Sequence, residues 1–248
     1  TGIISDYKKI YVMMKRYGAT VAFDAASFSS HGNLDADYFD ALFLSPHKLL
    51  GGVGSCGLLA IKKELVKSDK PTFAAGGTVS YVSRSSHFFA PSVERMEEGG
   101  TQHVMGLIRA ALAYRLRNEV GLDVIKSRED ELTKQFCEGL DEIPEVVSYF
   151  PRAVPRLPIF AFNVKGVSPY DFAEALSEDY GVQTRAGCAC AGPYGHDLLG
   201  LKDDQKFDQK PGWVRVSLHY SHTPKDVAYL LKAIKKTIKK FKTIKDKK

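Results

Sequence analysis

The chain has 248 residues and a mass of 27.4 kDa, and 44% of its residues are hydrophobic, enough for one sizeable core and a second, smaller one. No stretch approaches the roughly 20 uninterrupted apolar residues of a membrane span, and TGIISDYKK at the amino terminus is unlike a signal peptide. Four cysteines are too few for a disulfide scaffold, and much of the formal charge of +6 comes from the terminal KAIKKTIKKFKTIKDKK, typical of a solvated helix face. We therefore expect a cytoplasmic protein with reduced thiols that binds neither membranes nor nucleic acid.

Helical and strand patterns alternate along the first half of the sequence. The expected elements, in chain order, are a helix over 5–17, a buried strand ending at Asp24, buried strands over 40–44 and 57–61, and helices over 101–120 and 122–140. Thr101 is the expected N-cap of the first long helix, and Cys56 is expected to pack in a strand. This alternation predicts an α/β domain, which we place at residues 1–125.

A second pattern begins after a proline-rich link. Its expected elements are a strand in IFAFNV, a helix over 169–180, strands in VQTRAG and GWVRVSLH, and a final helix. Ser168 and Thr223 are each followed by proline, and serine or threonine as N-cap with proline at the first helical position is a favourable helix start. We expect a small α+β domain at residues 126–248.

The least ordinary stretch is SPHKLLGGVG, where Lys48 lies on the link between two predicted core strands. Such a lysine is either exposed on a turn or buried, and burial would lower its pKa and make its neutral amine a nucleophile. Asp24 ends the preceding predicted strand, at the sheet edge where ligands bind in α/β folds. A carboxylate there can keep a pyridinium nitrogen protonated while Lys48 binds a pyridoxal aldehyde. Together the two residues favour the buried, reactive lysine.

Five segments resemble, in order, the class V branch of the fold-type I pyridoxal-phosphate enzymes, and most closely the cysteine desulfurases and selenocysteine lyases. They are GATVAFDAAS, SPHKLLGGVGSCGLL, EEGGTQ, TRAGCACAGP and VRVSLHYSHTPKDV. The resemblance implies a large α/β domain with a mostly parallel sheet, followed by the small α+β domain. It also implies pyridoxal 5'-phosphate as the cofactor and no metal.

The resemblance assigns cofactor roles to individual residues. Lys48 is implied to be the catalytic lysine that binds the aldehyde as a Schiff base, and Asp24 the partner of the pyridine nitrogen. Ser45 and His47 are implied to bind the phosphate, and His47 is grouped with the catalytic residues as well. Thr101 is implied to bind the phosphate of the neighbouring subunit's cofactor, which implies a homodimer with shared active sites.

The resemblance also implies a substrate and a reaction. Arg185 and Arg215 match arginines near the substrate carboxylate, and the planar guanidinium suits that partner. Cys190 matches the catalytic cysteine, whose thiolate would take sulfur from L-cysteine, or selenium from a selenocysteine-like amino acid, and release alanine. The persulfide would then pass to an acceptor protein. Cys188 is either a relay for that sulfur or an inert neighbour, and Cys137 is expected to pack in a helix.

Two departures from the family pattern stand out. Ser27 occupies the cofactor-binding position where the family usually has a glutamine, so the hydrogen bond to the phenolic oxygen is made differently or lost. The chain is also shorter than family members and lacks their amino-terminal portion, so we expect a fragment, with a sheet incomplete at its amino-terminal side.

Two other functions stay open at this point. Another class V enzyme, an aminotransferase or a lyase, would share Lys48 and Asp24 but would have no use for Cys190. A non-catalytic, truncated sulfur-transfer module is the second alternative.

Overall fold

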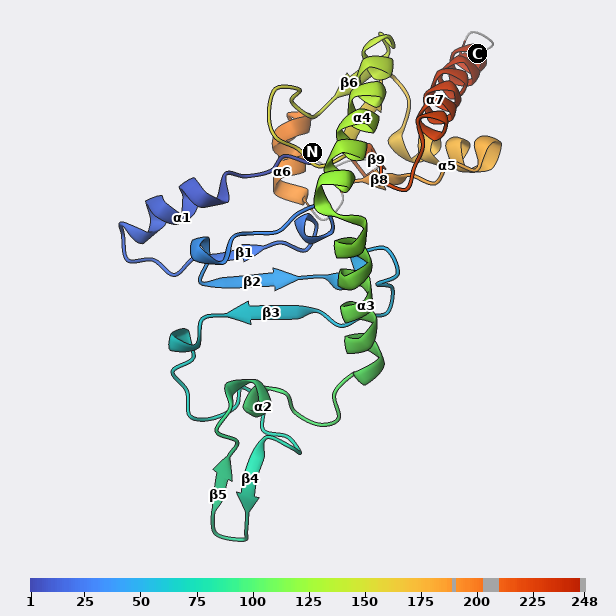
Figure 1. The fold of residues 1–248 in the computed structure, drawn as a ribbon. Helices are drawn as coiled ribbons and strands as arrows, with labels where there is room; N and C mark the ends of the chain where they lie inside the picture. The colour runs from blue at the N-terminus through green and yellow to red at the C-terminus, as the bar shows by residue number, and fades with distance from the viewer. Residues whose placement is uncertain (189–190, 203–209, 246–248) are drawn as a thin grey trace. The chain divides into compact units, whose positions relative to one another are not determined.

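The computed structural model describes residues 1–188, 191–202 and 210–245, and it divides into two compact units. One unit comprises Asp6–Leu122, and the other comprises Thr1–Ser5 together with Asp123–Lys248. Figure 1 shows the elements of both, with the first unit running from blue to green along the chain. Each unit is described by itself.

The unit Asp6–Leu122 is built around a three-stranded sheet. Its helices and strands are α1 (Tyr7–Lys15), β1 (Ala22–Asp24), β2 (Ala41–Leu44), β3 (Leu58–Ile61), β4 (Val79–Val82), β5 (His87–Phe89), α2 (Val93–Glu97) and α3 (Val104–Val120). Strands β1, β2 and β3 lie side by side in that order, with β1 parallel to β2 and β2 antiparallel to β3 (Figure 1). Strands β4 and β5 form a separate antiparallel hairpin.

A buried carboxylate fixes the beginning of this sheet. Asp40 is 3% exposed and accepts hydrogen bonds from the Val21 backbone N–H at 2.8 Å, Lys15 Nζ at 3.0 Å and Lys62 Nζ at 3.0 Å. The Val21 bond and the two lysines hold the pKa of Asp40 well below its ordinary value, although its burial acts in the opposite direction. The cluster therefore ties helix α1 and the end of β3 to the start of β2.

The unit that contains Asp123–Lys248 is an antiparallel sheet with helices. Its elements are α4 (Leu122–Asp141), β6 (Val146–Ser148), β7 (Ile159–Val164), α5 (Pro169–Tyr180), β8 (Arg185–Gly187), α6 (Gly192–Leu199), β9 (Trp213–Ser217) and α7 (Pro224–Lys245). The strand order is β6-β7-β9-β8, and each neighbouring pair is antiparallel. Ser168 caps α5 by accepting from the Tyr170 N–H at 3.3 Å, as its Ser-Pro start predicts.

The main hydrophobic core lies in this second unit. Apolar side chains of α4, β7, α5, β9 and α7 pack together there, and several are fully buried: Leu132, Phe136, Phe160, Phe162, Leu176, Val214, Val227 and Ile234. Residues 160–162 of β7 are all buried, so both faces of this strand are covered there.

Four sequence expectations are wrong in detail. The strand that ends at Asp24 was expected to be buried, but β1 is half-buried only at Phe23 and exposed at Ala22 and Asp24. The first long helix begins at Val104 and not at Thr101, because Gly100 has a positive φ of 78° and its N–H bonds Gly76 O at 2.7 Å, which keeps this segment in a turn. Cys56 lies in the loop before β3 and not in a strand. Residues 57–61 were expected to be buried, but β3 is half-buried only at its first residue and exposed at the other three.

Candidate active site

Two parallel strands end at the same edge of the first sheet. Asp24, the last residue of β1, pairs in register with Phe43 of β2, and the Ala25 N–H continues the pairing by bonding Phe43 O at 2.9 Å. Ser45 follows the end of β2 directly. The structure therefore places Asp24 and the segment that contains Lys48 at one carboxyl edge, where ligands bind in sheets of this kind.

Lys48 ends a short 3₁₀ turn, Pro46–Lys48. Its Nζ donates to Ser27 Oγ at 3.4 Å, so the turn after β2 meets the turn after β1. The side chain is exposed, which corrects the expectation of a buried lysine. The reason is local: of the three residues of the turn only Pro46 is buried, and Lys48 lies beyond the end of the strand.

The Asp24 carboxylate is also exposed at this edge. Its Oδ1 accepts from the Ala26 N–H at 2.8 Å, which fixes the orientation of the side chain. No lysine or arginine in the ranges that the structure describes forms an ion pair with it. Its negative charge is therefore accessible to a cationic group of a ligand.

Ser45 and His47 flank the lysine turn. Ser45 is half-buried and its carbonyl accepts from the Lys48 N–H at 3.0 Å, which closes the turn. His47 is exposed. A hydroxyl, an imidazole and an amine thus lie within four consecutive residues, a donor set suited to an anion.

The glycine-rich link after Lys48 is tightly folded. A Cβ on Gly52 would lie 1.9 Å from Pro46 O, so only glycine fits there. Its N–H bonds Leu49 O at 2.9 Å. This close approach folds the link back against the lysine turn.

Helix α3 supports both turns of the site. Arg117 is 5% exposed and donates to the carbonyls of Ser29 and Gly32 and, at 2.8 Å, to Asn33 Oδ1. Arg109, two turns earlier, donates to Val53 O in the glycine-rich link at 3.2 Å. One helix therefore fixes the segment that follows Ser27 and the segment that follows Lys48.

Two arginines face each other in the second unit. Arg185 of β8 and Arg215 of β9 are register partners in an antiparallel pair, so their side chains leave the same face of the sheet. Their placement suits a carboxylate ligand.

The cysteine loop follows β8. Cys188 Sγ donates to Pro211 O at 3.3 Å and would lie 3.2 Å from a Cβ on Gly195, so this thiol is packed against its neighbours. Cys190 lies outside the described residues.

Thr101 belongs to the unit Asp6–Leu122. It is exposed in the turn between α2 and α3.

Comparisons with known proteins fit these observations. The family described as aminotransferase class-V matches residues 1–230. The chain belongs to the class-V aminotransferase family. A probable cysteine desulfurase of Pyrococcus abyssi is 30% identical over 245 residues, which are 98% of this chain and 58% of that protein. A second one, of Staphylococcus aureus, is 31% identical over 224 residues, which are 90% of this chain and 51% of that protein.

Solved structures of cysteine desulfurases also match this chain. The apo structure of a cysteine desulfurase from Thermococcus onnurineus matches with a TM-score of 0.84 at 31% identity, covering 96% of this chain and 57% of that one. The cysteine desulfurase CsdA from Escherichia coli matches with a TM-score of 0.82 at 26% identity, covering 94% and 55%. The predicted fold-type I transferase fold is confirmed, and the chain spans between about half and three-fifths of the length of these relatives.

The structure groups the predicted site residues in two sets. Asp24, Ser27, Ser45, His47 and Lys48 lie together in the unit Asp6–Leu122. Arg185 and Arg215 lie together in the other unit, and Thr101 belongs to the first unit but lies in a separate turn.

Sequence reasoning missed two of the three arginines of α3, Arg109 and Arg117. Arg117 is buried beneath the turn that follows β1, in a helix that the sequence does predict. A buried arginine must satisfy five N–H donors, which makes it an anchor for backbone carbonyls. The signal was weak, because arginine is also common on exposed helix faces, as Arg115 is in the same helix.

The described residues offer neither a metal site nor a membrane-spanning helix. No group of three or more His, Cys, Asp or Glu side chains there could hold a metal ion. None of the helices in the described ranges is long and apolar enough to cross a membrane.

Proposed function

We propose that the chain contains the catalytic residues of a pyridoxal-phosphate-dependent cysteine desulfurase, which converts L-cysteine to L-alanine and retains the sulfur as a persulfide on Cys190. The observation that carries this proposal is the common edge of β1 and β2, where Asp24 lies with Lys48 and its Ser27 contact. The names of the similar proteins support the choice of reaction.

The residues at this edge fit the cofactor. Lys48 Nζ would bind the aldehyde carbon, and its contact is a neutral hydroxyl at 3.4 Å that leaves the amine available. Asp24, without a cationic partner among the described residues, would accept from the pyridine N–H. Ser45 and His47 would hold the phosphate, and Ser27 would contact the phenolic oxygen. Bound pyridoxal phosphate supplies an electron sink for negative charge at the substrate Cα.

The chain's own residues then have separable tasks. Arg185 and Arg215 would bind the substrate carboxylate through the paired N–H groups of their guanidinium planes. Lys48 Nζ would accept a proton from the substrate Cα and return it.

Cys190 would carry out the sulfur step. Its thiolate attacks the substrate sulfur, a sulfur–sulfur bond forms, and the carbon–sulfur bond breaks. The electron pair stays with the substrate carbon, which is protonated to give alanine. The persulfide passes from Cys190 to an acceptor. Cys188 is better suited to packing than to relay, because its Sγ is already bonded to Pro211 O.

We further propose a cytoplasmic homodimer in which Thr101 binds the phosphate of the cofactor in the neighbouring subunit. Thr101 is exposed and follows Gly100, whose bond to Gly76 fixes the turn. Thr101→Ala should weaken cofactor binding in the dimer, and it should have no such effect in a verified monomer.

One experiment tests the reaction. Protein containing this chain is reconstituted with pyridoxal phosphate and incubated with L-cysteine, and alanine is measured together with the persulfide. Cys190→Ser should keep the visible absorbance of the bound cofactor and lose alanine production, because its thiol is not a cofactor ligand. Borohydride reduction should attach the cofactor covalently to Lys48 in the unmodified chain and in Cys190→Ser. Lys48→Ala should lose both this adduct and alanine production. Alanine formation at the original rate in Cys190→Ser would contradict the proposal.

The family assignment itself favours one alternative. Its description covers aminotransferases, for which Cys190 has no task. Formation of a keto acid from an amino acid, with no response to cysteine, would identify that function.

A further inference from the structure

Helix α7 has a stripe of uncompensated lysines. Lys232, Lys236 and Lys239 follow one another at spacings of four and three residues, so they lie on one helix face, and all three are exposed. Within the described part of the chain, no carboxylate forms an ion pair with any of them. Three like charges on consecutive turns repel one another, so this face favours an anionic partner.

The neighbouring lysines of α7 differ. Each is neutralised by an acidic residue of the same unit: Lys235 by Glu142 and Lys240 by Asp179, at 2.8 and 2.6 Å, and Lys242 by Glu145. These pairs lie on the two flanks of the helix, and the stripe lies between them. The stripe is therefore a local charge excess and not a general property of the lysine-rich helix.

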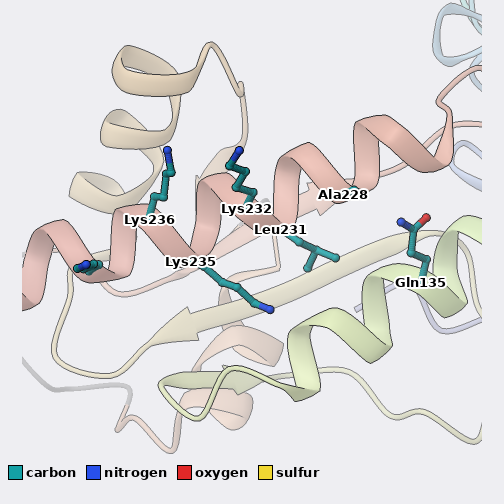
Figure 2. Close-up of a pocket in the computed structure, with 7 residues that line it drawn as sticks. Gln135, Ala228, Leu231, Lys232, Lys235 and Lys236 are labelled. Carbon is teal, nitrogen blue, oxygen red and sulfur yellow. The ribbon is translucent and has the colours of Figure 1, made fainter.

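The stripe borders a groove between α7 and α4. The groove has a volume of about 470 Å³, and Gln135, Ala228 and Leu231 line it together with the stripe and Lys235 (Figure 2). A Cβ on Gly139 would lie 2.3 Å from Leu231 Cδ1, so the two helices touch there, and Gln135 Nε2 bonds Pro224 O at 3.0 Å. Ala228 and Leu231 are thus the apolar part of a lining that is otherwise lysine and glutamine, and direct contacts between the helices fix it.

The groove continues along the helix. A second hollow of about 240 Å³ shares Lys235 and Lys239 with the first and extends to Lys242. Glu142 and Glu145 also line it, and each is paired with a lysine, Lys235 and Lys242 respectively. From Ala228 to Lys242 the rise of an α-helix gives a length of about 20 Å, which matches a partner helix of about 14 residues.

The opposite face of α7 is already occupied. Val227, Ile234 and Ile238 are buried in the core of the unit, so the helix has no free apolar face to insert into a lipid surface. Nucleic acid is a poor match for the groove, because its lining residues include no arginine for bidentate phosphate contacts and no aromatic ring for base stacking. Lysine ammonium groups beside aliphatic side chains fit carboxylates and apolar side chains together.

We propose that this groove docks an acidic amphipathic helix of a partner protein. Its carboxylates would pair with Lys232, Lys236 and Lys239, and its apolar side chains would pack on Ala228 and Leu231, the usual mode of a helix in a groove. The proposal does not depend on the desulfurase reaction, because none of these residues belongs to the site described above.

The test uses the full chain and a labelled synthetic helix of about 15 residues, with glutamates spaced like the lysines and leucines beside them. Fluorescence anisotropy at low ionic strength should show saturable binding that weakens as salt is added. The variant Lys232→Ala/Lys236→Ala/Lys239→Ala should bind the peptide at least about tenfold more weakly. A charge-matched control, Lys9→Ala/Lys67→Ala/Lys70→Ala in the other unit, should bind like the unmodified chain.

Several results would overturn the proposal. One is undiminished peptide binding by the groove variant, or no binding by the unmodified chain. Equal binding of a scrambled peptide of the same composition would show that charge alone, and not this groove, selects the ligand. Tighter binding of a single-stranded oligonucleotide, or of phosphatidylserine vesicles, with the same loss in the groove variant would assign the stripe to those partners instead.

Discussion

The buried guanidinium of Arg117 connects a helix to the site it supports. It donates to two backbone carbonyls and to Asn33 in the segment that follows Ser27, and it lies 5.0 Å from the centre of the Tyr114 ring. Lysine cannot reproduce this set of contacts, because its donors all lie on one nitrogen, whereas the planar guanidinium spreads five donors over three. Arg117 is therefore a positioning residue for the Ser27–Lys48 contact.

We expect Arg117→Lys to reduce the free energy of unfolding by about 2–3 kcal/mol, through buried acceptors that lose their donors. It should also lower the yield of borohydride-trapped pyridoxal phosphate on Lys48, measured by peptide mapping. Arg115→Lys is the matched control, since Arg115 lies on the same helix in an exposed pair with Glu119. A normal trapping yield in a destabilised Arg117→Lys protein would show that its role is purely structural.

At the scale of elements, the glycine-rich link decides where the lysine turn lies. Gly52→Ala would place a methyl group against Pro46 O, 1.9 Å from the ideal Cβ, so the turn must shift. We expect the yield of borohydride-trapped pyridoxal phosphate on Lys48 to fall several-fold. Gly57→Ala is the control, because its nearest atom is Leu44 O at 3.8 Å, an ordinary contact. Equal trapping in both variants would show that the link does not position Lys48.

The sequence predicts most elements for identifiable reasons. Helix α5 begins at Pro169 and ends at Tyr180 as expected, because a Ser-Pro start and Gly181 in the left-handed conformation mark both ends. The hairpin of β4 and β5 and the short helix α6 were missed, since three- to eight-residue elements have little periodicity. The start of α3 was also predicted wrongly: Thr101 was expected to be the N-cap, but Gly100 keeps this segment in a turn and the helix begins at Val104.

At the scale of the whole molecule, the candidate site depends on pairings that no local pattern contains. That Asp24 and Lys48 come close follows from the parallel register of β1 and β2. The resemblance to the family supplied the roles of these residues, but not the Arg117 anchor or the exposure of Lys48. Periodicity identifies elements, whereas long-range contacts are set by packing, which one sequence shows only indirectly.

The two units also offer separate reporters of stability. Trp213 is the only tryptophan in the sequence and lies in β9, so its fluorescence reports the unit that contains Asp123–Lys248. Asp40 belongs to the unit Asp6–Leu122. Circular dichroism detects the unfolding of both units. A change in the circular dichroism signal that is absent from the Trp213 fluorescence therefore reports the unit that contains Asp40.

The last prediction concerns acid. The Val21 N–H and the two lysines depress the pKa of Asp40 in the folded state, so the unfolded chain binds the proton more readily. The stabilisation is complete above the ordinary aspartate pKa of about 4 and is lost as pH falls below it. Denaturant midpoints measured by circular dichroism should therefore decrease on acidification.

Two variants test whether Asp40 causes this decrease. Asp40→Asn keeps an oxygen for the Val21 N–H, and it should be less stable near neutral pH and respond less to acid. Asp37→Asn, at an exposed position, should behave like the unmodified chain. The same acid response in all three proteins would remove Asp40 as its cause.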